Sequence, residues 1–337
     1  MDYKDVLKNA KVNLNGSCRV CPVCNGKACA GEVPGMGGKG TGEAFRANID
    51  ALGGYKLNMR TLHNCSNPDT SIELFGKKMR IPVFAAPVSG TILNMGGKFT
   101  EEEYISWIIK GCLHRGIYPM VGDTAVDSFL ITNLQELKKV DGNGVAIIKP
   151  WENSDVISKI HLAEEAGAYA VGMDIDAAGL ITLSLHGKSV GPKTIEDIKE
   201  IVESTKLPFI LKGIMTSDEA ELAAEAGVAA IVVSNHGGRV LDQTPGVANV
   251  LPQIATKVKG RVKILADGGV RNGVDVLKML ALGADAVLIG RPLVSASFGG
   301  QTDGVKAYID NIAADLKSAM ILTGCNSIKE VTGRILV

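Results

Sequence analysis

The feature that most constrains the fold of this chain is a regular alternation of short apolar runs with amphipathic segments, which begins near residue 80. The runs are apolar throughout and are too short to be helices of ordinary length. Such runs are typical of strands that are buried on both faces of a parallel sheet. The eight runs are Ile81–Ala86, Ile117–Val121, Val145–Ile148, Tyr169–Met173, Pro208–Leu211, Ala229–Val233, Val262–Ala266 and Asp285–Ile289.

The amphipathic segments between these runs predict helices that cover the sheet. Eight successive units favour an α/β fold of the closed (β/α)8 TIM barrel type over an open doubly wound sheet. The segment Thr302–Leu322 is then the helix that closes the ring. We expect residues 76–337 to form the barrel and residues 1–75 to form an N-terminal extension. The clearest predicted helices are Glu101–Arg115, Ser154–Ala166, Thr194–Ser204, Asp218–Ala226 and Gly273–Leu282.

The charge balance and the cysteine content exclude several classes of protein. Lys+Arg and Asp+Glu are equal at 36 each, so no excess positive charge favours nucleic acid or an acidic membrane surface as a partner. No apolar run is long enough to cross a bilayer, and the N-terminus lacks the core of a signal peptide. The seven cysteines do not resemble a secreted disulfide framework in a chain of this length. We therefore expect a cytoplasmic protein with no nucleic-acid or membrane partner.

A glycine-rich motif at Gly35–Gly40 formally satisfies the dinucleotide fingerprint G-x-G-x-x-G. The fingerprint needs a preceding strand, whereas Pro34 and a cysteine cluster precede this motif. We therefore predict a flexible glycine loop and not a Rossmann site.

Polar and charged residues directly follow the apolar runs. In a barrel these positions share one face, which carries the active site. His236 can exchange a proton near neutral pH, and Arg239 can bind a carboxylate or phosphate in a bidentate manner. Lys212 alone could be a structural barrel salt bridge, but charged side chains at so many strand ends indicate a site. The residues at the strand ends are Pro87, Val88, Ser89, Asp123, Lys149, Trp151, Asp174, Asp176, Lys212, Ser234, His236, Arg239, Asp267, Gly268, Gly269, Arg271, Gly290 and Arg291.

The last two strand ends predict a phosphate site. Gly268, Gly269 and Gly290 can present backbone N–H groups to an anion, and Arg271 and Arg291 add positive charge. The loops after strands seven and eight are the usual phosphate site of these barrels. A phosphorylated substrate or cofactor is therefore expected.

Several of these segments resemble the FMN-dependent 2-hydroxy acid oxidases and dehydrogenases, the family of glycolate oxidase, lactate oxidase and flavocytochrome b2. The resemblance extends from about Phe45 to the C-terminus. The segments that carry it are Leu207–Gly213, Val233–Arg239, Asp267–Arg271, Ala281–Asp285 and Ile289–Pro292.

The resemblance implies an FMN enzyme that oxidises a small 2-hydroxy acid, such as lactate or glycolate, to the 2-oxo acid, with flavin N5 as the electron acceptor. It makes His236 the base, Asp176 its orienting carboxylate and Arg239 the ligand of the substrate carboxylate. Lys212 is implied to lie beside flavin N1 and O2. The remaining implied flavin contacts are Pro87, Val88, Ser89, Lys149, Asp174, Ser234, Asp267, Gly268, Gly269, Arg271, Gly290 and Arg291.

The chain departs from the family pattern around the substrate. Lys149 and Trp151 stand where the family has a glutamine and a substrate-contacting tyrosine, and Trp151 is therefore expected at the substrate. Asp174 replaces a threonine near flavin N3 and is expected to accept the N3 proton. A second carboxylate-binding arginine is absent from Ala177–Thr182. Two alternatives stay open: a non-redox FMN isomerase resembling type 2 isopentenyl diphosphate isomerase, and a flavin electron-transfer protein. The resemblance also implies a homo-oligomer.

Four cysteines near the N-terminus have the spacing C-x2-C-x2-C-x4-C. Cys18, Cys21, Cys24 and Cys29 could be reduced thiols in a structured loop, ligands of an iron–sulfur cluster, ligands of zinc, or a redox disulfide. The spacing approaches a bacterial ferredoxin run, which has three residues before its last cysteine. An iron–sulfur cluster would indicate that electrons leave to another carrier.

Overall fold

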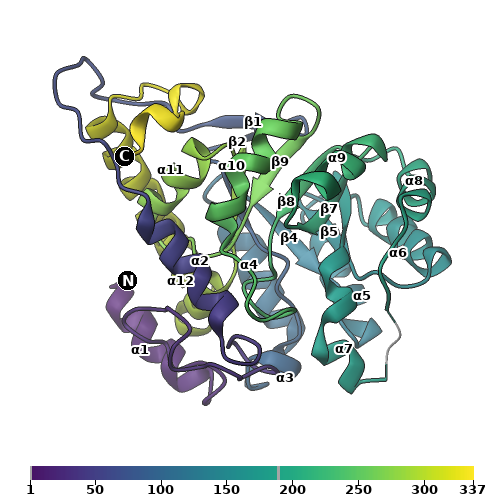
Figure 1. Ribbon diagram of the computed structural model, residues 1–337. Coiled ribbons are helices and arrows are strands. Elements are labelled where there is room, and N and C mark those ends of the chain that lie inside the picture. Colours follow the sequence, from purple (N-terminus) through teal and green to yellow (C-terminus); the bar gives the residue numbers. More distant parts are fainter. Residues whose placement is uncertain (1, 188–189) are drawn as a thin grey trace.

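The computed structural model describes residues 2–187 and 190–337 and contains a closed barrel of eight parallel strands. The strands follow one another around the ring in chain order, and the last pairs with the first (Figure 1). The TIM barrel prediction is confirmed, and all eight apolar runs contain a strand. The barrel strands are β3 (Val83–Ala85), β4 (Tyr118–Gly122), β5 (Val145–Ile148), β6 (Ala170–Asp174), β7 (Phe209–Ile214), β8 (Ala230–Val233), β9 (Lys263–Ala266) and β10 (Ala286–Ile289).

Helices surround the barrel, and the five clearest predicted ones are confirmed to within two residues at either end. Local capping explains where several begin: Thr100 and Thr194 each form a capping box with the acidic residue three positions on. The helices of the barrel are α3 (Thr91–Asn94), α4 (Glu101–Leu113), α5 (Asp127–Lys138), α6 (Asn153–Glu165), α7 (Ile181–Leu185), α8 (Ile195–Glu203), α9 (Ser217–Glu225), α10 (Val247–Val258), α11 (Gly273–Ala281) and α12 (Arg291–Thr323), with 3-10 turns at Ile175–Gly179, Ile328–Glu330 and Gly333–Ile335.

The closing helix α12 begins earlier than the predicted Thr302. It starts at Arg291 and is interrupted at Gly300 and Gln301, whose backbone angles are not helical. The sequence prediction covered only the part after this kink. The part before it places Arg291 directly after β10, at the mouth of the barrel.

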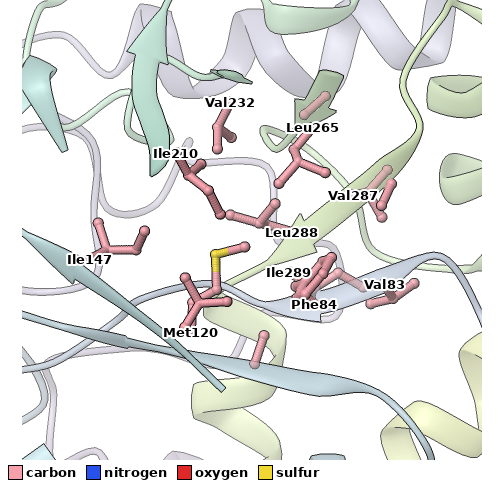
Figure 2. Packing of buried hydrophobic residues seen from close by; sticks show 14 of the residues in the cluster. Val83, Phe84, Met120, Ile147, Ile210, Val232, Leu265, Val287, Leu288 and Ile289 are labelled. Atoms are coloured by element: carbon pink, nitrogen blue, oxygen red, sulfur yellow. The ribbon is translucent and has the colours of Figure 1, made fainter. Parts of the chain in front are cut away.

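The barrel interior is filled by apolar side chains from successive strands (Figure 2). Met120, Ile210 and Leu288 point toward one another in its centre, and all three are almost fully buried. A barrel of this size is a packed core and not a pore, so ligands must bind at its ends.

The N-terminal extension packs on the barrel at several places. Helix α1 (Tyr3–Asn13) lies along α12, where the Asn13 side chain donates to the Phe298 carbonyl at 2.7 Å. Helix α2 (Glu43–Gly54) lies near α10, and the strands β1 (Ile72–Leu74) and β2 (Lys77–Met79) form a hairpin. The turn of that hairpin coincides with the expected boundary at residues 75 and 76, and the division into extension and barrel stays a prediction. Within the described residues, no helix combines the length and apolarity needed to span a membrane.

Candidate active site

A cavity with an empty volume of about 1060 Å³, open mouth included, lies at the carboxyl ends of the strands. Most residues expected from the strand ends line it, and they come from every part of the ring. The expected residues in its wall are Pro87, Val88, Ser89, Asp123, Lys149, Asp174, Lys212, His236, Arg239, Asp267, Gly268, Gly269, Arg271, Gly290 and Arg291.

The cavity contains an imidazole held by a carboxylate. His236 Nδ1 lies 2.8 Å from Asp176 Oδ1, and the Asp176 side chain is mostly buried behind the ring. Ser234 stabilises the turn that carries His236. Its hydroxyl accepts a hydrogen bond from the backbone N–H of His236 at 3.0 Å and donates to Asp267 Oδ2 at 2.8 Å. With Nδ1 bound to Asp176, Nε2 is the nitrogen left for a ligand. This pairing is the arrangement of a general base whose tautomer is set by a carboxylate.

Two buried lysines share one carboxylate at the floor of the cavity. Lys149 Nζ lies 2.7 Å from one oxygen of Asp174, and Lys212 Nζ lies 2.8 Å from the other. Burial alone would raise the pKa of Asp174, but interactions with His236 and the two lysines hold it well below its usual range. Burial would likewise lower the pKa of Lys212, yet the neighbouring aspartates raise it above its usual range. Lys212 also lies 3.9 Å from Asp267, so two lysines and two aspartates meet at the cavity floor.

Three arginines at the cavity have no carboxylate within 4.0 Å among the residues that the structure describes: Arg239, Arg271 and Arg291. Burial and then the charge of Arg291 lower the pKa of Arg239 to about 9. Burial and then the charge of Arg271 lower the pKa of Arg291 to about 10. The three arginines are half-buried, and cations withdrawn from water without a counter-charge are costly, so this part of the cavity favours an anionic ligand.

The residues after β9 present the groups that a phosphorylated, hydroxyl-bearing ligand needs. Gly268 and Gly269 have positive φ angles of 83° and 92°, and a side chain at either position would collide with Asn48. Asp267 Oδ1 and Arg271 Nε are buried polar atoms without a partner in the described chain. An acceptor and a cationic donor left open in one cavity match the ribityl hydroxyls and the phosphate of FMN. The residues present therefore fit FMN.

The glycine loop expected to be flexible is instead fastened across the mouth. The Arg239 guanidinium donates to the Gly35 carbonyl, and the Arg291 guanidinium donates to the carbonyls of Met36 at 2.7 Å and Gly37 at 3.0 Å. These backbone carbonyls are good acceptors for a guanidinium group, and the two arginines have no carboxylate partner in the described part of the chain. The loop thereby adds Met36 to the cavity wall.

One further expectation needs correction. Trp151 was expected at the substrate, but it lies outside the cavity lining, where its indole N–H donates to Asp123 Oδ2 at 2.5 Å. A neighbouring charged group that is distant in sequence thus takes the hydrogen bond of Trp151. Asp174 was expected to accept a flavin proton, and this stays a prediction: each of its oxygens accepts from one lysine ammonium group, and a carboxylate oxygen can accept a second hydrogen bond.

Sequence reasoning missed wall residues that lie on loops and short helices. Asn94 accepts a hydrogen bond from Arg239 at 2.8 Å and lines the cavity beside Leu93. Leu180, Thr182 and Leu183 complete the wall after β6. No motif marks these residues, since only chain folding brings them to the barrel mouth.

The barrel and its anion-binding cavity define a TIM-barrel flavoenzyme site, and comparisons with known proteins agree. The family model for FMN-dependent dehydrogenases matches residues 35–184 and 182–337. The chain belongs to this FMN-dependent dehydrogenase family. FMN is accordingly its cofactor.

Similar proteins include oxidases and dehydrogenases of 2-hydroxy acids. The chain is 31% identical to a peroxisomal (S)-2-hydroxyacid oxidase of Arabidopsis thaliana, over 88% of each chain. It is 31% identical to an L-lactate dehydrogenase of Alcaligenes faecalis, over 89% of this chain and 92% of that one. A crystal structure of mandelate oxidase matches with a TM-score of 0.83 and 27% identity, over 99% of this chain and 97% of that one.

Proposed function

We propose that this enzyme oxidises a 2-hydroxy acid to the 2-oxo acid, with His236 as the base. The observation that carries this proposal is that His236, held by Asp176, lines the same cavity as Arg239, a half-buried arginine without a carboxylate partner among the described residues. A 2-hydroxy acid offers a carboxylate for the arginine and an adjacent carbon from which a base can remove hydrogen. The similar oxidases and dehydrogenases support this chemistry.

Each residue has a distinct task in this reaction. Arg239 binds the substrate carboxylate, and Asn94 holds the guanidinium in place. His236 Nε2 takes a proton from the substrate, and Asp176 stabilises the imidazolium that forms. FMN, when bound, supplies the acceptor for the two electrons. Lys149 and Lys212 place two ammonium groups at the cavity floor, and Lys212 in particular can stabilise negative charge that develops nearby.

The substrate's side chain would meet a largely apolar wall. Met36, Leu93, Leu180 and Leu183 line the cavity, and Arg239 donates to Gly35 and Asn94, the neighbours of the first two. We therefore propose a 2-hydroxy acid with an apolar side chain, which can bury surface against these residues.

The test is the anaerobic visible spectrum of the FMN-loaded enzyme before and after addition of L-lactate, glycolate or mandelate. Bleaching of the flavin by one acid is expected. His236→Gln should abolish bleaching while FMN stays bound, and Asp176→Asn should slow it by several orders of magnitude. His161→Gln, an exposed histidine on α6, is the matched control and should behave as the parent enzyme. Bound FMN that none of the acids bleaches would refute the proposal.

The cytoplasmic location and the homo-oligomeric state stay predictions. Size-exclusion chromatography with light scattering checks the oligomeric state.

A further inference from the structure

The segment that carries Cys18, Cys21, Cys24 and Cys29 has no role in the proposed reaction. It precedes residue 35, where the match to the FMN-dependent dehydrogenase model begins. All four thiols are free and only partly buried, whereas the other three cysteines are buried. Cysteine that serves only packing is usually fully buried, so these four do not behave as core residues.

The four thiols share one anchored loop, which we call the cysteine loop (residues 18–29). Both ends of the loop are held by backbone hydrogen bonds, because the Met36 N–H donates to the Ser17 carbonyl at 3.1 Å and the Gly38 N–H donates to the Cys29 carbonyl at 3.2 Å. The Val20 N–H donates to Cys18 Sγ at 3.4 Å, an interaction that suits a sulfur carrying negative charge. Figure 1 shows the segment between α1 and α2 at the same end of the molecule as α3 and α7.

Cationic groups connect the cysteine loop to the cavity. Arg271 Nη2 donates to the Cys24 carbonyl at 3.3 Å and to Cys24 Sγ at 3.5 Å. Arg291 interacts electrostatically with Cys24, Cys29 and Cys18. Both arginines also line the cavity. Thiolates bound to a metal centre would place negative charge beside these two half-buried arginines.

The distances between the four sulfur atoms help to distinguish a zinc site from an iron–sulfur cluster site. In the described chain, no three of these thiols lie within 4.8 Å of one another. A single zinc ion bound by four thiolates at ~2.3 Å would hold the sulfurs only ~3.8 Å apart. In a four-iron cluster each thiolate binds a different iron, so its sulfurs stand further apart. The spacing of the four cysteines along the chain, which is close to that of bacterial ferredoxins, favours the cluster.

We propose that Cys18, Cys21, Cys24 and Cys29 bind a four-iron iron–sulfur cluster that takes electrons from the flavin. The electron-transfer part rests on the proposed function. Oxidation of one 2-hydroxy acid releases two electrons and two protons. A cluster carries one electron at a time, so two successive transfers to a soluble one-electron carrier protein complete a turnover, and the protons leave to solvent.

The site is tested by anaerobic reconstitution of the full chain with ferrous iron and sulfide, followed by iron, sulfide and zinc analysis. About four irons and four sulfides per chain are expected. Cys24→Ser should remove most of this iron while the FMN content is unchanged. Cys65→Ser is the matched control, because Cys65 already donates to the Cys325 carbonyl and a serine can replace that donor. Stoichiometric zinc, or four reactive thiols without iron, would overturn the site.

The electron path is tested separately by electron paramagnetic resonance. Addition of L-lactate, or of whichever acid bleaches the flavin, should produce the signal of a reduced cluster in the parent and not in Cys24→Ser. If dithionite reduces the cluster but the flavin reduced by the acid does not, the electron path is overturned, whereas the assignment of the cluster site still holds. If no acid bleaches the flavin, the proposed function fails, whereas the iron and sulfide content still decides the site.

Discussion

Replacement of Asp174 by asparagine removes the carboxylate that two buried ammonium groups share. Asp174 lies 2.7 Å from Lys149 and 2.8 Å from Lys212, and all three side chains are at most 8% exposed. Breaking a buried ion pair by removing one partner costs about 3–5 kcal/mol. A lysine can limit this cost by releasing its proton, which at pH 7 takes about 4.6 kcal/mol from an ordinary pKa near 10.4. We therefore expect a loss of about 3–5 kcal/mol in the free energy of unfolding at pH 7.

The pH dependence distinguishes this electrostatic cost from a simple packing defect. In the parent protein the pKa of Lys212 is raised, so its stabilising contribution is fully present below about pH 10 and stays constant from pH 7 to 9. In the variant Lys149 loses its carboxylate partner, whereas Lys212 still lies 3.9 Å from Asp267. Release of a proton from the unpaired lysine becomes easier by about 1.4 kcal/mol for each pH unit. The difference in stability between the two proteins should therefore shrink toward pH 9.

The assay is urea unfolding followed by circular dichroism at pH 7 and pH 9, with the same free FMN concentration throughout. The double variant Lys149→Met/Asp174→Asn removes the unpaired charge of Lys149 and should be more stable than the single variant at pH 7. A destabilisation that does not change with pH, together with a double variant no more stable than the single one, would refute the reasoning.

Three other predictions concern single residues. Arg239→Lys should weaken lactate binding about tenfold or more in a flavin-bleaching titration, because lysine cannot reproduce the planar fork, and unchanged affinity would contradict its role. Asp242 accepts N–H bonds at the start of α2, which outweigh the effect of burial and lower its pKa to about 2. Asp242→Ala should therefore cost about 1 kcal/mol at neutral pH, and urea unfolding should show the difference fade as pH falls from 4 toward 2. Trp151→Phe should destabilise the protein by about 1–2 kcal/mol in urea unfolding, because the hydrogen bond to Asp123 is lost, and KM for lactate should not change. A raised KM would indicate that Trp151 contacts the substrate.

The sequence alone determined the barrel and most of the cavity wall, and the reason is local. Eight buried strands need runs that are apolar throughout, and such runs are legible without tertiary information. In a closed parallel barrel all strand ends meet on one face, so residues such as His236 and Lys212 could be assigned to one site.

Only the tertiary structure decided which charged groups pair with one another. Lys149 and Lys212 are far apart in the chain but share Asp174, and Trp151 turns away to Asp123. The carbonyls of Gly35 and Gly37 bind arginines more than 200 positions away. Hydrogen bonds and ion pairs depend on distances of a few ångströms, which the order of residues does not specify. The sequence could therefore name the members of the site, whereas their partners followed from the closure of the ring and the packing of the extension over its mouth.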